Sequence, residues 1–199
     1  MGRTVAETIR ALTQDLIDTG QGITIGQCLT AVGWVQNTIP PRDFGNYELP
    51  MTDIAGAGIA VGVALTGKRP ILVIRFQSFL WLNASPIVNY AAKSKEMFGI
   101  ACPVLVRAIA SERDGSGPIH TNCFHSMFMH MPGISVTAPM TPLEYESIWS
   151  SYLNHDDPML VSEHRSSYKN ENELPDIIAQ NADVTLFAIS AARFSAAEA

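Results

Sequence analysis

The chain has 199 residues, of which 47% are hydrophobic and 16% are charged, and its net charge is −6. A chain of this length and composition buries a sizeable core and is not disordered. Because no run of lysine or arginine accompanies the acidic balance, a nucleic-acid partner or an acidic membrane surface is not indicated, and no uninterrupted apolar stretch is long enough to span a bilayer.

The N-terminal third is expected to hold one helix, one strand and a long loop. Apolar residues recur at helical spacing over Val5–Thr19, which is the pattern of an amphipathic helix and not of a signal peptide. A short apolar strand is predicted at Ile23–Ile25. Residues 30–50 are predicted to form an irregular loop, because Pro40 and Pro41 interrupt any regular pattern there.

The middle of the chain alternates between helical and extended patterns. A glycine-rich helix is predicted at Asp53–Leu65, with Gly67 as its C-terminal stop and Pro70 beyond it. The elements predicted next are a strand at Ile71–Arg75, a helix at about Pro86–Phe98, a strand at Pro103–Ala108, a short helix near Cys123–Met129 and a strand at Ile134–Thr137.

The last third opens on a clear helix start. The stretch "TPLE" at 141–144 combines a capping hydroxyl, a proline at the first helical position and a carboxylate three residues after the cap. This helix is predicted to run to about Leu153 and to be followed by a strand at Met159–Glu163. After a linker-like stretch, one more strand is predicted at Val184–Ile189.

Strands and helices that alternate at this spacing predict an α/β fold, a parallel sheet with helices on both faces. The nearly continuous apolar strands agree with a sheet that is buried on both sides. We expect one domain over residues 1–182. Residues 183–199 are interpreted as the start of a truncated C-terminal domain, because the chain stops in what resembles the opening of a helix.

The three cysteines, Cys28, Cys102 and Cys123, are odd in number and widely spaced, and they include no CxxC pair. This usage is typical of reduced thiols in a cytoplasmic protein. We interpret all three as buried structural thiols.

The glycine-rich helix has two possible roles. Residues 56–62 read GxGxxxG rather than the GxGxxG of a dinucleotide-binding loop, and no buried strand precedes them, so nucleotide binding is the weaker reading. Glycine inside a helix costs about 0.5–1 kcal/mol relative to alanine. Gly58 and Gly62 lie four residues apart on one helix face, so we expect a tightly packed neighbour there, either a helix of the same domain or one of a second subunit.

Asp53 stands at the start of this helix and also has two explanations. An aspartate in the first turn complements the N–H groups and the dipole of the helix, which is a purely structural role. The alternative is a catalytic carboxylate, and the surrounding motifs favour it.

Five stretches in order resemble one known family: "ELPMTDIAGAGIAVGVALTGKRPI", "IVNYAAKSKEMFG", "PVLVRA", "IHTNCFHSMFMHMPGISVTAP" and "DDPMLVSEH". They resemble the pyrimidine-binding domain of the thiamine diphosphate enzymes of the transketolase superfamily. The resemblance covers the chain from about Arg3 to Ile189. It is strongest to the beta subunits of the pyruvate and branched-chain 2-oxo acid dehydrogenases.

The resemblance implies an enzyme subunit that needs a partner chain. In this family thiamine diphosphate binds between two domains, one of which holds the pyrophosphate through Mg²⁺ with a GDG…N motif. This chain has no such motif, so an alpha-type partner that holds the Mg²⁺ is implied, with a homodimer of this chain inside a heterotetramer. The implied function is the beta-type half of a 2-oxo acid dehydrogenase or decarboxylase. The alternatives are a split transketolase subunit and a non-catalytic paralogue that serves as a scaffold.

The resemblance also assigns residues, with two departures from the family. Asp53 matches the carboxylate that hydrogen-bonds a ring nitrogen of the aminopyrimidine and so activates the cofactor. The family has glutamate there, and aspartate withdraws the oxygens by roughly 1.5 Å, one C–C bond. Gln27 stands where the family has an acid, so it can hydrogen-bond cofactor or substrate but cannot shuttle a proton.

Three aromatic positions complete the expected site and its surroundings. Phe79 matches the ring that stacks on the pyrimidine, with an ordinary core phenylalanine as the alternative. His120 matches a histidine that reaches the substrate, with simple surface exposure as the alternative. His130 is expected to have a structural role, bonding backbone at a turn.

The histidines at 120, 125 and 130 are five apart and fan around a helix, so no metal site is predicted. The K⁺ loop of some relatives is not expected either, because His155 replaces its acid.

Overall fold

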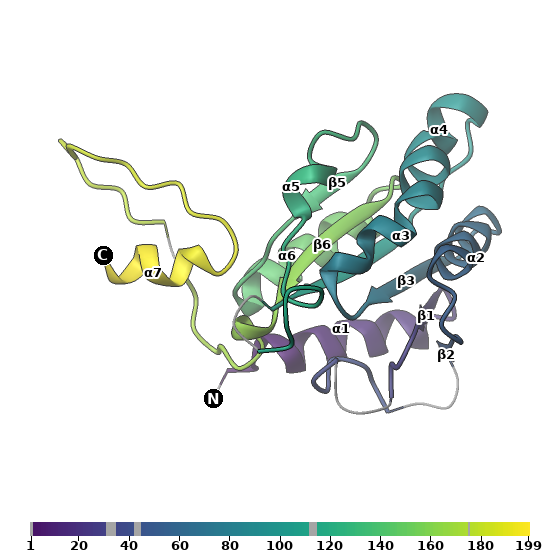
Figure 1. Ribbon diagram of the computed structural model, residues 1–199, viewed down its shortest axis with the longest axis horizontal. Coiled ribbons are helices and arrows are strands. Elements are labelled where there is room, and N and C mark those ends of the chain that lie inside the picture. The colour runs from purple at the N-terminus through teal and green to yellow at the C-terminus, as the bar shows by residue number, and fades with distance from the viewer. Residues whose placement is uncertain (1, 31–34, 42–44, 112–114, 175) are drawn as a thin grey trace.

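The computed structural model describes residues 2–30, 35–41, 45–111, 115–174 and 176–199 (Figure 1). Its six strands form one sheet in the order β2-β1-β3-β4-β6-β5, and every neighbouring pair is parallel. The strands are β1 (Gly22–Gly26), β2 (Asn46–Glu48), β3 (Arg69–Ile74), β4 (Leu105–Ala110), β5 (Ser135–Thr137) and β6 (Met159–His164). This sheet confirms the predicted α/β class.

From β2 onward a helix lies between each pair of successive strands, as is usual in a parallel sheet. The α-helices are α1 (Val5–Asp18), α2 (Asp53–Leu65), α3 (Leu80–Ser85), α4 (Ala92–Phe98), α5 (His125–Phe128), α6 (Pro142–Leu153) and α7 (Ala192–Glu198). The remaining helical segments are the 3₁₀ turns η1 (Gln77–Phe79) and η3 (Arg165–Ser167) and the π-helical turn η2 (Pro86–Ala91).

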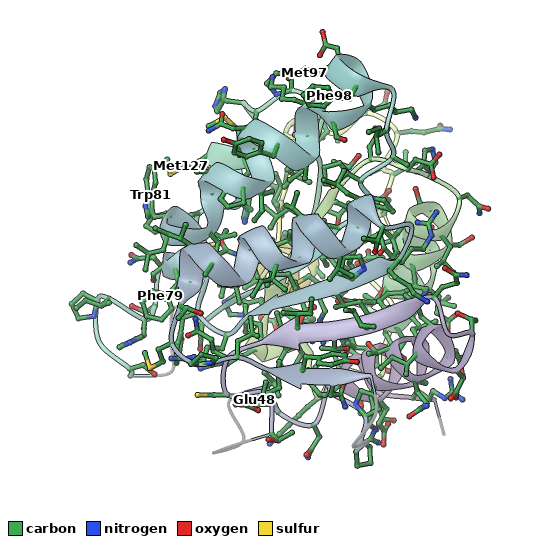
Figure 2. All side chains as sticks on the ribbon, turned by 90° about the vertical axis from the view of Figure 1, so that its right-hand side faces the viewer. Glu48, Phe79, Trp81, Met97, Phe98 and Met127 are labelled. Carbon is green, nitrogen blue, oxygen red and sulfur yellow. The ribbon has the colours of Figure 1, made fainter. Side chains whose placement is uncertain are left out.

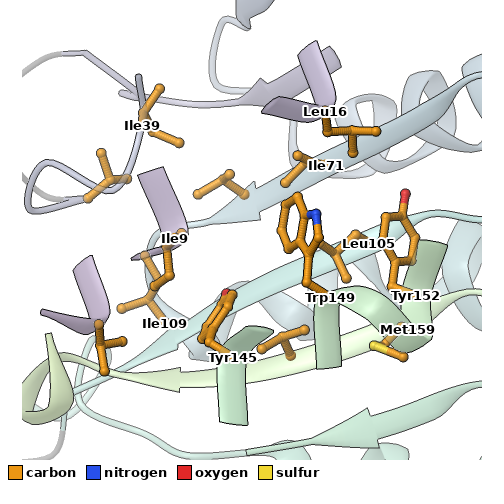
Figure 3. Close-up of a cluster of buried hydrophobic side chains, with 14 of the residues drawn as sticks. Ile9, Leu16, Ile39, Ile71, Leu105, Ile109, Tyr145, Trp149, Tyr152 and Met159 are labelled. Atoms are coloured by element: carbon orange, nitrogen blue, oxygen red, sulfur yellow. The ribbon is translucent and has the colours of Figure 1, made fainter. Parts of the chain in front are cut away.

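The core lies on both faces of the sheet because each central strand is apolar on both sides. In β3, Ile71 and Val73 point to the layer of α1 and α6, whereas Leu72 and Ile74 point to the layer of α2, α3 and η2. Figure 3 shows the first of these layers, where Trp149 of α6 packs against the strands. The predicted helices on both faces of the sheet are therefore confirmed.

Two helix starts follow directly from the sequence. At α1, Thr4 and Glu7 form a reciprocal capping box, in which the Glu7 N–H donates to Thr4 Oγ1 at 3.2 Å and the Thr4 N–H donates to Glu7 Oε2 at 2.9 Å. At α6, Thr141 accepts from the Glu144 N–H, and Pro142 is the first helical residue. The predicted start of α6 is confirmed.

The second long helical segment begins earlier than the sequence predicts. Helical structure runs from Leu80 through η2 to Phe98, whereas the prediction placed the start at Pro86. A proline inside an α-helix clashes with the carbonyl four residues before it. Here Pro86 opens the π-helical turn, a local widening that accommodates the ring and lets the helix continue.

Two further expectations about strands were wrong. The loop predicted over residues 30–50 contains the short strand β2, which pairs with β1 from Thr24 to Gly26. The strand predicted at Val184–Ile189 is absent, and Phe187 there is 93% exposed. An apolar run becomes a strand only where a neighbour pairs with it and a layer covers it. Figure 1 shows this segment extending from the body before the chain returns as α7.

An ion pair that sequence analysis did not predict lies inside the α1–α6 layer. Arg107 of β4 donates to Glu163 of β6 through Nε at 2.5 Å and through Nη2 at 2.9 Å, and neither side chain is exposed. The hydroxyls of Tyr145 and Tyr168 donate to the same carboxylate. Burial opposes ionisation of Glu163, but Arg107 and these hydroxyls outweigh it and hold the pKa of Glu163 below its usual range.

The structure agrees only in part with the interpretation of the three cysteines as buried thiols. All three are free thiols, and Cys102 is buried, but Cys28 and Cys123 are half-buried, so the interpretation of all three as buried was wrong for two of them. Within the described residues, no helix has both the length and the apolar character needed to cross a lipid bilayer.

Candidate functional site

A small pocket opens where β1 and β3 end and α2 begins. It is about 20 Å³ in volume, and its lining includes Gly26, Gln27, Asp53, Arg75, Phe79 and Asn83. The carboxyl ends of parallel strands are where open α/β sheets bind their ligands. The fold therefore places three of the predicted site residues, Asp53, Gln27 and Phe79, in one pocket.

Asp53 is the first residue of α2, and its side chain is half-buried. Asn83 Nδ2 donates a hydrogen bond to Asp53 Oδ1 at 3.4 Å, and it also donates to the Phe79 carbonyl at 2.9 Å. No described backbone N–H of α2 donates to the Asp53 carboxylate, and the Thr52 side chain makes no cap either. Among the described residues, no hydrogen bond supports the helix-cap explanation of Asp53. Asp53 lines the pocket, and its Oδ2 has no described partner.

Gln27 and Arg75 form the polar wall of the pocket. Arg75 Nη1 donates to Gln27 Oε1 at 3.2 Å, and both side chains are at least nine-tenths buried. The guanidinium of Arg75 also lies 5.9 Å from the centre of the Phe79 ring, within cation–π range. Because the amide oxygen is engaged, the amide N–H₂ is the group that Gln27 offers to a ligand.

Phe79 and His120 are in contact, although they are far apart in the sequence. Their ring centres lie 5.7 Å apart in an edge-on arrangement, and His120 lies 4.6 Å from the ring centre of Phe76. His120 Nδ1 is 3.1 Å from the Ser116 carbonyl oxygen, and the side chain is half-buried. The structure thus brings the fourth predicted residue to the edge of the Asp53 pocket.

Sequence reasoning missed two residues of the pocket, Asn83 and Arg75. Asn83 lies four residues after Phe79, so both occupy one face of the helical segment, and a polar residue on that apolar face was a usable signal. Arg75 is a charged residue directly after the apolar strand β3, which places it at the ligand-binding edge. Both signals are recognisable only once the strand and helix boundaries are known.

The expectations about the other histidines need correction. Helix α5 spans only His125–Phe128, so His120 and His130 lie outside it and do not fan around a common helix. His130 is exposed, and its side chain makes no hydrogen bond with the described residues, so the expected bond to backbone was wrong. Among the residues that the structure describes, no group of three or more His, Cys, Asp or Glu side chains is arranged to hold a metal ion.

The glycine face of α2 points away from the body of the domain. No described atom lies within 4 Å of the position that a Cβ would take at Gly58 or Gly62, so the expected neighbour in the same domain is not there. Around it, large apolar side chains are exposed on α2 and on the adjoining segment from α3 to α4. We call these residues the apolar helix face: Ile54, Ile59, Leu65, Trp81, Tyr90, Met97 and Phe98. Figure 2 views the molecule from this side.

The family model for the transketolase pyrimidine-binding domain matches residues 5–171. The chain belongs to this family. Among its relatives, the beta subunit of acetoin:2,6-dichlorophenolindophenol oxidoreductase from Cupriavidus necator is 31% identical over 131 residues, which are 65% of this chain and 39% of that protein. The beta subunit of 2-oxoisovalerate dehydrogenase from Bacillus subtilis is 27% identical over 124 residues, 61% of this chain and 38% of that protein.

A solved structure described as a split gene transketolase, an inactive beta4 tetramer, has the same fold as this pyrimidine-binding domain. It superposes with a TM-score of 0.64 at 12% sequence identity, and the match covers 93% of this chain and 57% of that one. The expected family and fold are therefore confirmed. The chain spans less than half the length of the two curated relatives described above.

Proposed function

We propose that this chain is the beta-type, pyrimidine-binding half of a thiamine diphosphate-dependent 2-oxo acid dehydrogenase, with an active site shared with an alpha-type partner. The observation that carries the proposal is the Asp53 carboxylate at the start of α2, which faces a pocket beside Phe79 instead of capping its own helix. The relatives named as beta subunits of acetoin and 2-oxoisovalerate oxidising enzymes support the same class of reaction.

The lining of the pocket suits a flat heterocycle with a polar edge. Asp53 supplies an acceptor, the Gln27 amide supplies a donor, and Leu49, Leu72 and Phe79 supply apolar surface. A volume of about 20 Å³ holds little more than one water molecule, so this chain by itself does not enclose a ring. A second chain that covers the mouth of the pocket is therefore part of the proposal.

Each residue has a proposed role toward the cofactor or the substrate. When bound, thiamine diphosphate would supply the nucleophilic carbon for addition to the keto group of the substrate. Asp53 Oδ2 would accept a hydrogen bond from a protonated ring nitrogen of the cofactor. Asn83 donates to Oδ1 and thereby fixes the direction of the carboxylate. Phe79 packs against the ring, and His120, next to it, positions and protonates the substrate.

The apolar helix face is the proposed contact with other subunits. Exposed apolar area of this extent is typical of an interface, and the open glycines Gly58 and Gly62 allow another helix to approach the backbone of α2 closely. The proposed assembly is a homodimer of this chain in a heterotetramer with the alpha-type subunit, which holds the pyrophosphate and Mg²⁺.

The test is co-expression with an alpha-type subunit that carries a GDG…N motif. We expect a stable complex that binds thiamine diphosphate in calorimetry and reduces 2,6-dichlorophenolindophenol with pyruvate, 2-oxoisovalerate or acetoin as substrate. Asp53→Asn, which keeps the shape but removes the charge, is expected to lower kcat by about 10²–10⁴-fold. Asp15→Asn, a matched change on the exposed side of α1, leaves kcat unchanged. A complex that turns over equally well with Asn at position 53 would refute the proposal.

A non-catalytic paralogue is the second candidate, and Gln27 is the observation that favours it. The amide is held by Arg75 and cannot exchange a proton. This candidate predicts a complex that binds the cofactor without turnover, and a gain of activity in the double variant Gln27→Glu/Asp53→Glu. A wild-type complex with higher turnover than the double variant would exclude it.

A further inference from the structure

A cysteine and a histidine are in direct contact at the start of α5. Cys123 Sγ lies 3.0 Å from His125 Nδ1, and the same nitrogen lies 3.0 Å from Ser162 Oγ on β6. A nucleophile within hydrogen-bond distance of a base is the basis of an activated thiol, and here the Ser162 hydroxyl shares with the sulfur the ring nitrogen that serves as the base. Both Cys123 and His125 are half-buried, so the sulfur is accessible as well as paired.

A buried amide fixes this arrangement. Gln77 is fully buried, and its Oε1 accepts from the backbone N–H groups of Phe124 and His125. Its Nε2 donates to Ser162 Oγ at 2.9 Å and to the Ala108 carbonyl at 3.1 Å. Gln77 therefore anchors the backbone of the pair to β4 and β6, and it also holds the Ser162 hydroxyl that His125 contacts.

The pair opens into a cavity of about 730 Å³ between the body of the domain and the segment that leads into α7. Its lining includes Cys123, His125, His164 and Ser166 from the body, with Ser190 and Phe194 from the C-terminal segment. This volume suits a small molecule. The cavity shares no lining residue with the Asp53 pocket.

We propose that Cys123 is a nucleophilic thiol, activated by His125, and that it is a site of oxidation by small hydroperoxides. The thiol proton passes to His125, and the thiolate attacks one peroxide oxygen. An S–O bond forms as the O–O bond breaks, so sulfur is oxidised to a sulfenic acid and the peroxide is reduced. The departing alkoxide or hydroxide takes the proton from His125 and leaves as an alcohol or water.

The imidazole explains why a hydroperoxide is the favoured electrophile. An oxygen anion is a poor leaving group unless a proton donor stands beside it, and His125 is 3.0 Å from the attacking sulfur. A disulfide releases a thiolate, which needs no such proton. Peroxide oxidation therefore gains more from this pair than exchange with a disulfide does.

The charged and titratable groups around the thiol come from three elements of the described structure. His125 on α5 favours the thiolate, and so does protonated His164 on β6, whose Nδ1 is 2.6 Å from Ser166 Oγ. Glu198 on α7 lines the same cavity, and its negative charge disfavours the Cys123 thiolate. Because the His125 ring nitrogen lies 3.0 Å from the sulfur, His125 is expected to have the largest effect on the thiolate.

The first experiment measures alkylation of each cysteine in the folded chain by iodoacetamide, with peptide mass spectrometry. Cys28 is also half-buried, and its sulfur has no hydrogen bond with a described residue, so it is the internal reference. Burial raises the pKa of Cys102 to about 11, so Cys102 serves as the unreactive control. At about pH 7, Cys123 is expected to react about tenfold faster than Cys28 and to reach half-maximal rate at a lower pH.

Two histidine variants distinguish the effect of the Cys123–His125 contact from the effect of the other residues that line the cavity. His125→Gln is expected to bring the rate of Cys123 down to that of Cys28, whereas His164→Gln leaves it within about twofold. Circular dichroism and the melting temperature confirm that both variants are folded. Equal rates for Cys123 and Cys28 in the wild type, or an equal loss in both histidine variants, would overturn the activated pair.

The second experiment tests the electrophile. Hydrogen peroxide is expected to give a sulfenic acid at Cys123, trapped by a dimedone probe, about 100-fold faster than in His125→Gln, because the variant loses both the thiolate and the proton donor. Oxidised glutathione is the comparison: its exchange needs the thiolate but no proton donor, so the same variant is expected to slow it only about tenfold, as it slows alkylation. If glutathione exchange depends on His125 as strongly as peroxide oxidation does, or if no sulfenic acid forms, the assignment to hydroperoxides fails.

Discussion

Arg107 and Glu163 form a two-point ion pair between neighbouring strands, with 0% and 1% of their side chains exposed. The pair is joined by two tyrosine hydroxyls and by Thr38 Oγ1, which accepts from Arg107 Nη2 at 2.7 Å. A buried charge is tolerated only when it is paired and hydrogen-bonded, so these side chains depend on each other.

Glu163→Gln is therefore expected to destabilise the chain by about 3–5 kcal/mol, because it leaves the Arg107 charge buried without a counter-charge. Urea unfolding followed by circular dichroism measures the change. Glu146→Gln, an exposed position on α6, is the matched control and is expected to change stability by less than about 0.5 kcal/mol. Similar stability for both variants would contradict the role of the pair.

The same carboxylate makes stability depend on pH. The pKa of Glu163 is lower in the folded chain than its ordinary value of 4.5, so the unfolded chain binds the proton more tightly. The contribution of Glu163 to the stability of the fold is complete above about pH 4.5. It is lost as the pH falls through the pKa that Glu163 has in the folded chain. Unfolding free energies measured from neutral to acid pH should show this loss in the wild type and a smaller one in Glu163→Gln.

Gly62→Ala is expected to stabilise the isolated chain by about 0.5–1 kcal/mol, because alanine is the better helix former and no described atom crowds the new methyl group. Gly56→Ala is the comparison, since its Cβ would meet Leu49 Cδ1 at 3.2 Å and its gain is expected to be smaller. Thermal unfolding measures both. If the apolar helix face binds another subunit, Gly62→Ala also weakens that association, which analytical ultracentrifugation would show.

Gly133→Ala is expected to be strongly destabilising. Gly133 has a φ of +87°, and a Cβ there would lie 2.0 Å from the Ala92 carbonyl oxygen. We expect a loss of at least about 2 kcal/mol from backbone strain and overlap together. Gly117→Ala has a similar φ of +82° but open space around it, so it reports the cost of backbone strain alone. Equal losses in the two variants would show that the contact with Ala92 carries no cost.

Asn83→Ala tests how the Asp53 carboxylate is held. Asn83 contacts Asp53 and the Phe79 backbone, so its loss is expected to leave the carboxylate free to rotate. In the proposed complex with an alpha-type subunit, kcat should fall about tenfold with little change in substrate KM. Unchanged kcat together with unchanged affinity for thiamine diphosphate would mean that Asn83 has only a structural role.

Much of the fold was predictable because it depends on local signals. The strand β3 is apolar on both faces, and the stretch at 141–144 carries a complete helix start, so both were placed from residues alone. The strand wrongly predicted at Val184–Ile189 is as apolar as β3, but no described strand pairs with it. The composition of a segment does not show whether a pairing strand lies beside it. The early start at Leu80 was missed because Pro86 is a strong breaker whose accommodation by a π turn depends on the surrounding helices.

The candidate site was predictable where single positions matched motifs, and unpredictable where it depends on distance in space. The resemblance selected Asp53, Gln27, Phe79 and His120, and the fold brings them together. It did not reveal that Arg75 holds Gln27, because the two residues follow different strands that are far apart in the sequence. The contact between Cys123 and His125 was likewise hidden, since residues two apart face each other only in particular backbone conformations.

The two outer strands of the sheet, β2 and β5, are three residues long each. An incoming strand would find few free backbone groups along either border, so growth of the sheet by strand addition is disfavoured. The two borders thus disfavour fibre-like stacking, and they leave the helical layers as the broad surfaces available to the proposed partner subunits.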